Sequence, residues 1–339
     1  MSQETHHSGA RISRRSALLL ATAGTAGIAI APVERSFAQT SDAAPAGGAV
    51  DDRDFAPGWR HYTIGNARLT CLLDGVAIAD DFDPIFGPDQ DREAMRELMR
   101  ANALPDDRFG SCFMPVAVEI GDQLVVVDAG FGASGRANGT GLMPERLEAS
   151  GYRREDVDLV LFTHLHGDHI LGVSDDGVPV FPNASYALGR VEMNYWETEA
   201  SGDRAELVAR LFGPLRDRTR LLDGGEEVMP GLTARATFGH TPGMLAFELD
   251  GGNDQRLLIT GDVFHSPVAS FQRPEWRVPF DEDHEAAVAT RRRVAQQLAE
   301  TGMPFTAYHL PFPGVGYVQR DGDNYRFVPE SYQLALNRR

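Results

Sequence analysis

The chain has 339 residues but only two cysteines, and it is short of positive charge. Its 32 basic residues stand against 49 acidic ones, which gives a formal net charge of −17. This balance argues against a phosphate-binding surface, so we expect no nucleic-acid partner. Cys71 and Cys112 have no cysteine or histidine nearby at metal-binding spacing, which argues against a sulfur-rich structural zinc site. A disulfide between them is open in an oxidising compartment, but we expect two buried thiols because a domain of this size needs no cross-link.

The sequence also lacks a hydrophobic run well suited to a bilayer span. The apolar run at residues 17–30 is short and is diluted by glycine and threonine. Arg14 and Arg15 precede it, and residues 36–38 (Ser-Phe-Ala) follow as a small-x-small cleavage site. This order is typical of a twin-arginine export signal. We predict that residues 1–38 are removed, that no stable membrane anchor remains, and that the protein is periplasmic or secreted.

No internal repeat of fixed period is present, and the rest of the chain predicts one domain. Residues 39–57 are rich in Ala, Pro, Gly and Asp and predict a flexible leader, followed by a folded domain over residues 58–339. Residues 80–108 interrupt the strand pattern with a helix-like stretch. A flap over a site and a surface insertion are both compatible with this segment.

Short apolar strands alternate with helical segments along the folded part. Residues 61–75 predict two strands joined at Gly65-Asn66, and residues 285–302 predict the clearest helix, with Ala287, Val294 and Leu298 on one stripe. This mixed order predicts an α/β fold in which two sheets pack together with helices outside them.

The densest chemical signal is "THLHGDH" at residues 163–169, directly after an apolar strand. Imidazole nitrogens and carboxylate oxygens are ligands for zinc and its first-row neighbours. Alternate residues of a loop can point to one side, so His164 and His166 can meet one ion while Asp168 and His169 reach a second. Two ions need more than four ligands, and the loop alone is therefore not a complete site.

Three later strands supply further candidates at their ends: His240 in "GHTPG", Asp262 in "TGDVF" and His309 in "YHLPFPG". Loops at strand ends, held by a rigid sheet, are where sites are usually built. The carboxylate of Asp262 could bridge two ions. His265, close to Asp262, is either an outer residue of the same site or an unrelated surface or core histidine.

With "VVVDAG" upstream, these motifs resemble the metallo-β-lactamase fold superfamily over about residues 60–315. The block "HLPFPGVGYV" near the C-terminus is similar to the group of methyl parathion hydrolase and related lactonases. The resemblance implies a four-layer αβ/βα sandwich of two mixed β-sheets flanked by helices, with a dinuclear site at one edge. In this chain Met244 replaces the last histidine of the family's "GHTPGH".

The resemblance also assigns roles to single residues. One metal is held by His164, His166 and His240, the other by Asp168, His169 and His309, with Asp262 as the bridge. Asp128 orients ligands from behind. Candidates for the substrate pocket are Trp196, Phe113 and Phe264; Trp196 is equally compatible with core packing. Tyr186 and Tyr308 are the candidates for a tyrosine that polarises a carbonyl. The cofactors are two divalent ions, with Zn²⁺ as the first candidate and Mn²⁺, Fe²⁺ and Co²⁺ as alternatives.

These features predict a metal-dependent hydrolase in which a metal-bridging hydroxide attacks an ester, lactone or phosphotriester, with Asp168 and Asp262 as its catalytic carboxylates. A β-lactam or thioester hydrolase and a mononuclear iron enzyme that oxidises sulfur compounds are alternatives with the same fold. A non-enzymatic binding or scaffold protein would not need all seven ligands. We expect a small-molecule substrate, and the sequence leaves a homodimer open.

Overall fold

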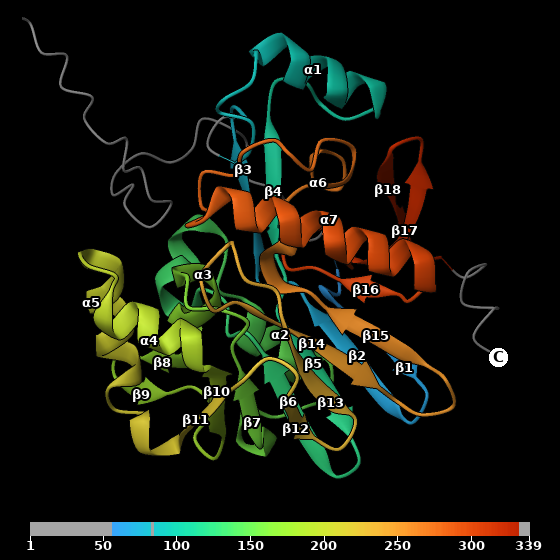
Figure 1. Ribbon diagram of the computed structural model, residues 1–339. Helices are drawn as coiled ribbons and strands as arrows, with labels where there is room; N and C mark the ends of the chain where they lie inside the picture. Colours follow the sequence, from blue (N-terminus) through green and yellow to red (C-terminus); the bar gives the residue numbers. More distant parts are fainter. Residues whose placement is uncertain (1–55, 83–84, 332–339) are drawn as a thin grey trace, which may run out of the picture. The chain divides into compact units, whose positions relative to one another are not determined.

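The computed structural model describes residues 56–82 and 85–331, so the predicted export signal and nearly all of the predicted leader lie outside the described residues. Two seven-stranded sheets dominate the described part (Figure 1). The first contains, in spatial order, β1 (Trp59–Ile64), β2 (Ala67–Leu72), β5 (Val116–Ile120), β6 (Gln123–Val127), β7 (Leu159–Leu161), β10 (Ser185–Gly189) and β11 (Thr219–Leu222). The second contains β12 (Glu227–Met229), β13 (Leu232–Ala236), β14 (Leu245–Asp250), β15 (Arg256–Ile259), β16 (Phe305–Thr306), β17 (Val315–Asp321) and β18 (Asn324–Pro329). Both sheets mix parallel and antiparallel pairs, as predicted.

Helices cover the outer face of each sheet. Apolar side chains of α2 (Met143–Ala149), α3 (Gly167–Ile170), α4 (Arg190–Thr198) and α5 (Asp203–Phe212) form one core with the first sheet. Those of α6 (Ala269–Gln272) and α7 (His284–Thr301) form another with the second sheet. The order helix, sheet, sheet, helix confirms the predicted four-layer sandwich. None of the helices within the described ranges is both long and apolar enough to cross a membrane.

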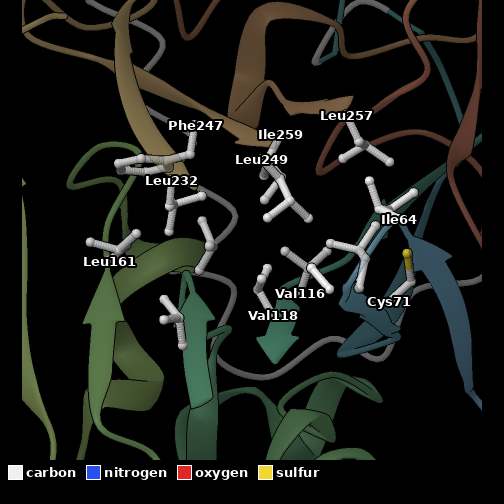
Figure 2. Close-up of a cluster of buried hydrophobic side chains, with 14 of the residues drawn as sticks. Ile64, Cys71, Val116, Val118, Leu161, Leu232, Phe247, Leu249, Leu257 and Ile259 are labelled. Atoms are coloured by element: carbon white, nitrogen blue, oxygen red, sulfur yellow. The ribbon is translucent and has the colours of Figure 1, made fainter. Parts of the chain in front are cut away.

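The strand sequences explain why the two sheets pack face to face. Successive side chains of a strand point to opposite faces, so apolar residues on both faces allow a sheet to be buried on both sides. In β5, Val116 and Val118 point into the core between the sheets, while Ala117 points to the helices. In β14, Phe247 belongs to the core between the sheets and Ala246 to the outer one. Figure 2 shows this central core, where side chains from both sheets meet.

The strand directions place the predicted site residues at one edge. β6 runs parallel to β7, and β15 runs parallel to β16. β13 and β15 are both antiparallel to β14, so they share one direction. The carboxyl ends of β6, β7, β13, β15 and β16 lead into the loops with the candidate ligands. Strand ends that point the same way bring residues distant in sequence to a common edge.

The segment at residues 80–108 has a small core of its own. It contains α1 (Arg92–Ala101), at the top of Figure 1, and it connects β3 (Gly75–Ala79) to β4 (Phe109–Phe113), which pair as a two-stranded sheet. Its buried apolar residues pack with Val268, Trp276 and Val278, and Asn102 exchanges amide hydrogen bonds of 3.2 and 2.7 Å with Gln272. The segment is therefore anchored on residues 268–278, and its function as a flap stays a prediction.

Cys71 and Cys112 are free and buried, which confirms the expected pair of thiols. Burial raises the pKa of both, that of Cys112 to about 12, so both remain protonated near neutral pH.

Truncation of the central core gives a test of the sandwich. Phe247→Ala removes a fully buried ring between the sheets, and we expect a loss of about 3–5 kcal/mol in the free energy of unfolding. Val178→Ala, at a side chain that is 66% exposed, should change it by less than about 0.5 kcal/mol. Urea unfolding followed by tryptophan fluorescence measures both. Equal losses in the two variants would contradict the packing described above.

Candidate metal centre

All seven predicted ligands converge at the edge of the sandwich. Three groups of side chains could each hold a metal ion, because the ligand atoms within each group lie within 4.8 Å of one another; one of them, His240, Asp262 and His265, shares two of its members with the other two groups. The first group, here called the three-histidine group, consists of His164, His166 and His240. The second, here called the mixed group, consists of Asp168, His169, Asp262 and His309.

Asp262 lies between the two groups. It sits in a tight turn after β15, and its side chain is almost fully buried. Its Oδ2 atom lies 3.3 Å from His240 Nε2 and 3.8 Å from His164 Nε2, in the three-histidine group. The same oxygen lies 3.0 Å from His309 Nε2, and Oδ1 lies 3.3 Å from His169 Nε2, in the mixed group. This geometry suits a carboxylate that contacts two ions.

The three-histidine group brings three ring nitrogens to one point. His240 Nε2 lies 3.2 Å from His164 Nε2 and 3.0 Å from His166 Nδ1. The other ring nitrogen of His240 donates to Asp281, and that of His164 donates to the hydroxyl of Thr163. In the neutral rings this leaves lone pairs on the two Nε2 atoms, which face each other. A cation placed between such lone pairs relieves their repulsion.

Hydrogen bonds from behind fix the rings of the other two histidines. His169 Nδ1 donates to Asp128 Oδ2 at 2.8 Å, and His309 Nδ1 donates to the carbonyl of Cys112 at 2.9 Å. Both rings therefore turn Nε2 toward the centre. Metal-binding histidines typically donate their second nitrogen to a carboxylate or a backbone carbonyl in this way.

Asp128 also holds the start of the loop at residues 163–169. It also accepts from the backbone N–H and the hydroxyl of Thr163, both at 2.9 Å. Its φ of 62° lies in the left-handed region, which is unusual for a residue with a side chain and is typical of functional positions. The position fits the predicted orienting function of Asp128.

The electrostatics of the centre favour a cation. Burial alone would raise the pKa of Asp262, but the imidazoles of His309 and His169 lower it well below its usual range. Burial alone would likewise lower the pKa of His240, but Asp262 and Asp281 raise it to about 9. The buried atoms His169 Nε2 and Asp262 Oδ1 have no hydrogen-bond partner among the described residues. Unpaired lone pairs in an environment that favours positive charge fit divalent ions held by nitrogen and oxygen.

The candidate ligands differ in their exposure to solvent. The side chains of His164, His169, His240 and Asp262 are at most 3% exposed. Those of Asp168, His309 and His166 are 19%, 10% and 10% exposed. Solvent therefore reaches the centre at these three side chains.

The predicted pocket aromatics lie in different places. Phe113 lies 5.4 Å from the His309 ring, between centroids, and packs on Phe131. Trp196 lies 6.0 Å from the His166 ring and also belongs to the core under α4 and α5. Phe264 is fully buried and stacks on Phe271 in the outer core of the second sheet, so the structure does not bring it to the centre.

The two tyrosines also separate. Tyr186 is fully buried in the outer core of the first sheet, where its hydroxyl donates to the carbonyl of Phe181 at 3.3 Å. Tyr308 lies against the His169 ring at 3.8 Å between centroids, and its hydroxyl donates to the backbone carbonyl of Asp168 at 2.6 Å. Tyr308 is therefore at the centre, with its hydroxyl already engaged.

Sequence reasoning missed two carboxylates and left His265 open. Asp281 accepts from His240 Nδ1 and forms a buried ion pair with Arg291 at 3.1 Å. Glu192 contacts the loops of the three-histidine group from α4. His265 is buried against the centre, with its ring stacked on His309 and its Nε2 3.5 Å from Asp262 Oδ2. The sequence around the two carboxylates carries no motif that predicts these contacts.

Comparisons with known proteins agree with this geometry. Residues 110–301, more than half of the chain, match the Metallo-beta-lactamase superfamily. The crystal structure of the hydrolase AbOPH in the beta lactamase superfamily aligns with 81% of this chain and 98% of its own, at 30% identity and a TM-score of 0.74. The dizinc quorum-quenching lactonase AidC aligns with 81% of this chain and 98% of its own, with a TM-score of 0.77; at 24% identity this shows the fold alone.

Among curated proteins, the N-acyl homoserine lactonase of Bacillus cereus is 27% identical over 151 residues, which are 44% of this chain and 54% of that protein. The match thus spans about half of the relative's length. The family match, the sandwich and the two ligand groups at its edge lead to one assignment: the chain belongs to the metallo-β-lactamase superfamily.

Proposed function

We propose that this protein is a dinuclear metal-dependent hydrolase that acts on an ester, lactone or phosphotriester bond. The observation that carries the proposal is the position of Asp262 between two complete ligand groups. A pair of bound divalent ions would supply a hydroxide nucleophile near neutral pH and polarise the bond under attack. Zn²⁺ is the first candidate because the ligands are nitrogen and oxygen atoms, with Mn²⁺, Fe²⁺ and Co²⁺ as alternatives.

The residues of the chain would orient the metal ligands, give the substrate access to the centre and transfer protons. Asp128, Asp281 and the carbonyl of Cys112 set the rotation of three imidazoles. Asp168 is the most exposed carboxylate of the two groups, so it is placed to move a proton between the centre and solvent. Phe113 offers an apolar wall next to His309, a candidate ligand that is also partly exposed.

The relatives favour hydrolysis of a lactone or another ester over the alternative reactions with the same fold. Lactonases and a hydrolase occur among the similar proteins, which favours a lactone or another ester as substrate over a β-lactam or a thioester. An iron enzyme with one metal ion would leave the ligands of the mixed group unused. That group is nevertheless complete and has its own orienting bonds from Asp128 and the Cys112 carbonyl.

Location is part of the proposal. The arginine pair at positions 14 and 15, the apolar run and the cleavage site support export by the twin-arginine route to the periplasm or beyond. That route carries folded proteins, which suits a protein that binds its metal before export.

The first test is a substrate panel with the zinc- or manganese-loaded full chain: an aryl ester, several lactones, a phosphotriester and a cephalosporin. We expect turnover of a lactone, an ester or the phosphotriester. If two metals bind per chain and none of these compounds reacts, the proposed substrate class is wrong.

Removal of the shared carboxylate should abolish the reaction. In Asp262→Ala we expect loss of bound metal and a fall in turnover of more than about a hundredfold, because even outer partners of metal ligands cost 10–100-fold when removed. Asp122→Ala, the same change in an exposed turn, is the control and should keep both. Metal analysis and initial rates measure the effect. Retention of two metals and full activity in Asp262→Ala would refute the assignment.

Replacement of both arginines of the pair should block export. Arg14→Lys with Arg15→Lys keeps the charge but removes the twin-arginine motif, so we expect the precursor to stay in the cytoplasm. Cell fractionation followed by mass spectrometry of the N-terminus reports location and cleavage. The unchanged chain in cells without a twin-arginine translocase is the matched control. Normal export of the double variant would contradict the proposed route.

A further inference from the structure

The three-histidine group depends on two loops from different sheets. His164 and His166 follow β7 of the first sheet, whereas His240 lies between β13 and β14 of the second. A metal site tolerates errors of only about 0.5 Å in the position of its ligands. Something must therefore fix one loop relative to the other.

The carboxylate of Glu192 connects these two loops. From the first loop, Leu165, which lies between the two histidines, donates its backbone N–H to Glu192 Oε1 at 3.0 Å. From the second loop, the hydroxyl of Thr241 and the backbone N–H of Gly243 donate to Oε2 at 2.7 and 3.1 Å. The indole N–H of Trp196 completes the set, at 2.7 Å from Oε1.

The backbone around Glu192 leaves little room for adjustment. A Cβ atom on Gly243 would lie 1.9 Å from the backbone nitrogen of Glu192, and one on Gly189 would lie 2.6 Å from the carbonyl oxygen of Gly243. Helix α4 and the His240 loop therefore touch through their backbones. This contact holds the carboxylate at a fixed distance from the His240 loop.

The ionised carboxylate of Glu192 can accept from all four partners at once. Glu192 is fully buried, and all four partners are donors. Charge-assisted hydrogen bonds are stronger than neutral ones, and buried donors left without an acceptor cost about 1–3 kcal/mol each. The arrangement thus stabilises one relative position of the two loops.

The mixed group is held by other contacts. Its orienting bonds come from Asp128 to His169, from the Cys112 carbonyl to His309 and from the Tyr308 hydroxyl to the backbone of Asp168. None of the hydrogen bonds found for Glu192 in the described part of the chain reaches this group.

We propose that Glu192 is a positioning residue that ties the two loops of the three-histidine group together and so sets the metal affinity of that group alone. The inference rests on the proposed function, because it takes both groups as metal sites. Glu192 touches no ligand atom; it acts through Leu165, Thr241 and Gly243.

Glu192→Gln is the decisive variant. Glutamine keeps the length of the side chain, but its NH₂ group cannot accept a hydrogen bond. It would therefore leave the N–H of Gly243 or the N–H of Leu165 without an acceptor, depending on which of the two it faces. In zinc titrations of the full chain against a chromophoric chelator, we expect one of the two zinc ions to bind about 10–100-fold more weakly and the other to bind unchanged. Excess zinc should restore turnover, which a general loss of folding would not allow.

Two backgrounds assign the weakened ion. With His309→Ala, only the three-histidine group is complete, and Glu192→Gln should lower zinc affinity there. With His240→Ala, only the mixed group is complete, and Glu192→Gln should have no effect. The absorption spectrum of bound Co²⁺ should change in the first background and stay constant in the second.

Glu197→Gln is the matched control. It makes the same change on the same helix at an exposed side chain whose hydrogen bonds go to Arg216, so zinc affinity should stay as in the unchanged chain. If Glu192→Gln does not fold, Thr241→Val removes one bond to the His240 loop and should show the same selective loss in smaller measure. Thermal unfolding of the zinc-free proteins separates affinity from stability.

The outcomes separate the two proposals. Unchanged zinc affinity in Glu192→Gln, equal weakening of both ions, or the same loss in Glu197→Gln would overturn the positioning role while leaving the hydrolase intact. A native chain that binds a single zinc would overturn the dinuclear function. The effect of Glu192→Gln in the His309→Ala background would still decide the role of Glu192.

Discussion

The buried carboxylate of Asp262 is the constraint on which the rest of the centre depends. An ionised carboxylate away from water is costly unless it is paired, and here the imidazoles of His164, His169, His240 and His309 lie within 3.0–3.8 Å of it. If all these imidazoles were protonated they would repel one another, and if all were neutral the carboxylate would have no counter-charge. The two divalent cations proposed above would resolve this conflict, because they would pair with the carboxylate and with the lone pairs of both groups. The orienting bonds to the second ring nitrogens fit this arrangement.

The sandwich makes such a centre possible by bringing strand ends of two sheets together. Apolar residues at successive strand positions allow both faces of each sheet to be buried, which makes the sheets rigid. Polar groups concentrate in the loops at their edge. Direct bonds then cross from sheet to sheet at this edge. The backbone N–H of Leu245 donates to the carbonyl of Thr163 at 2.9 Å, next to the Asp128 contact. His309, which follows β16 of the second sheet, donates to the carbonyl of Cys112 in β4 of the two-stranded sheet. The loops that carry the candidate ligands thus also connect the two sheets.

Local sequence was enough to predict the ligands and the layers, but not what holds the ligands in place. The ligands lie in short motifs directly after apolar strands, and a strand end is a local signal. Glu192 and Asp281 act across 27 to 51 residues of sequence, and nothing near them shows which donors they meet. Glu192 reads as an ordinary polar residue of a helix until the fold places Gly243 against its backbone. The prediction of Phe264 as a pocket residue was wrong. Phe264 follows Asp262 by two residues, but the turn at 261–263 directs its ring into the outer core.

The same distinction separates reaction from substrate. The seven candidate ligands and their orienting partners form only the floor of a site whose more exposed members are Asp168, His309 and His166. What surrounds that opening comes from other parts of the chain. Phe113 ends β4, the strand that carries residues 80–108 back to the first sheet, and this segment packs on residues 268–278, which begin shortly after His265. Changes in residues 80–108 can therefore reach Phe113 and residues 268–278 through this apolar contact while every candidate ligand stays in place.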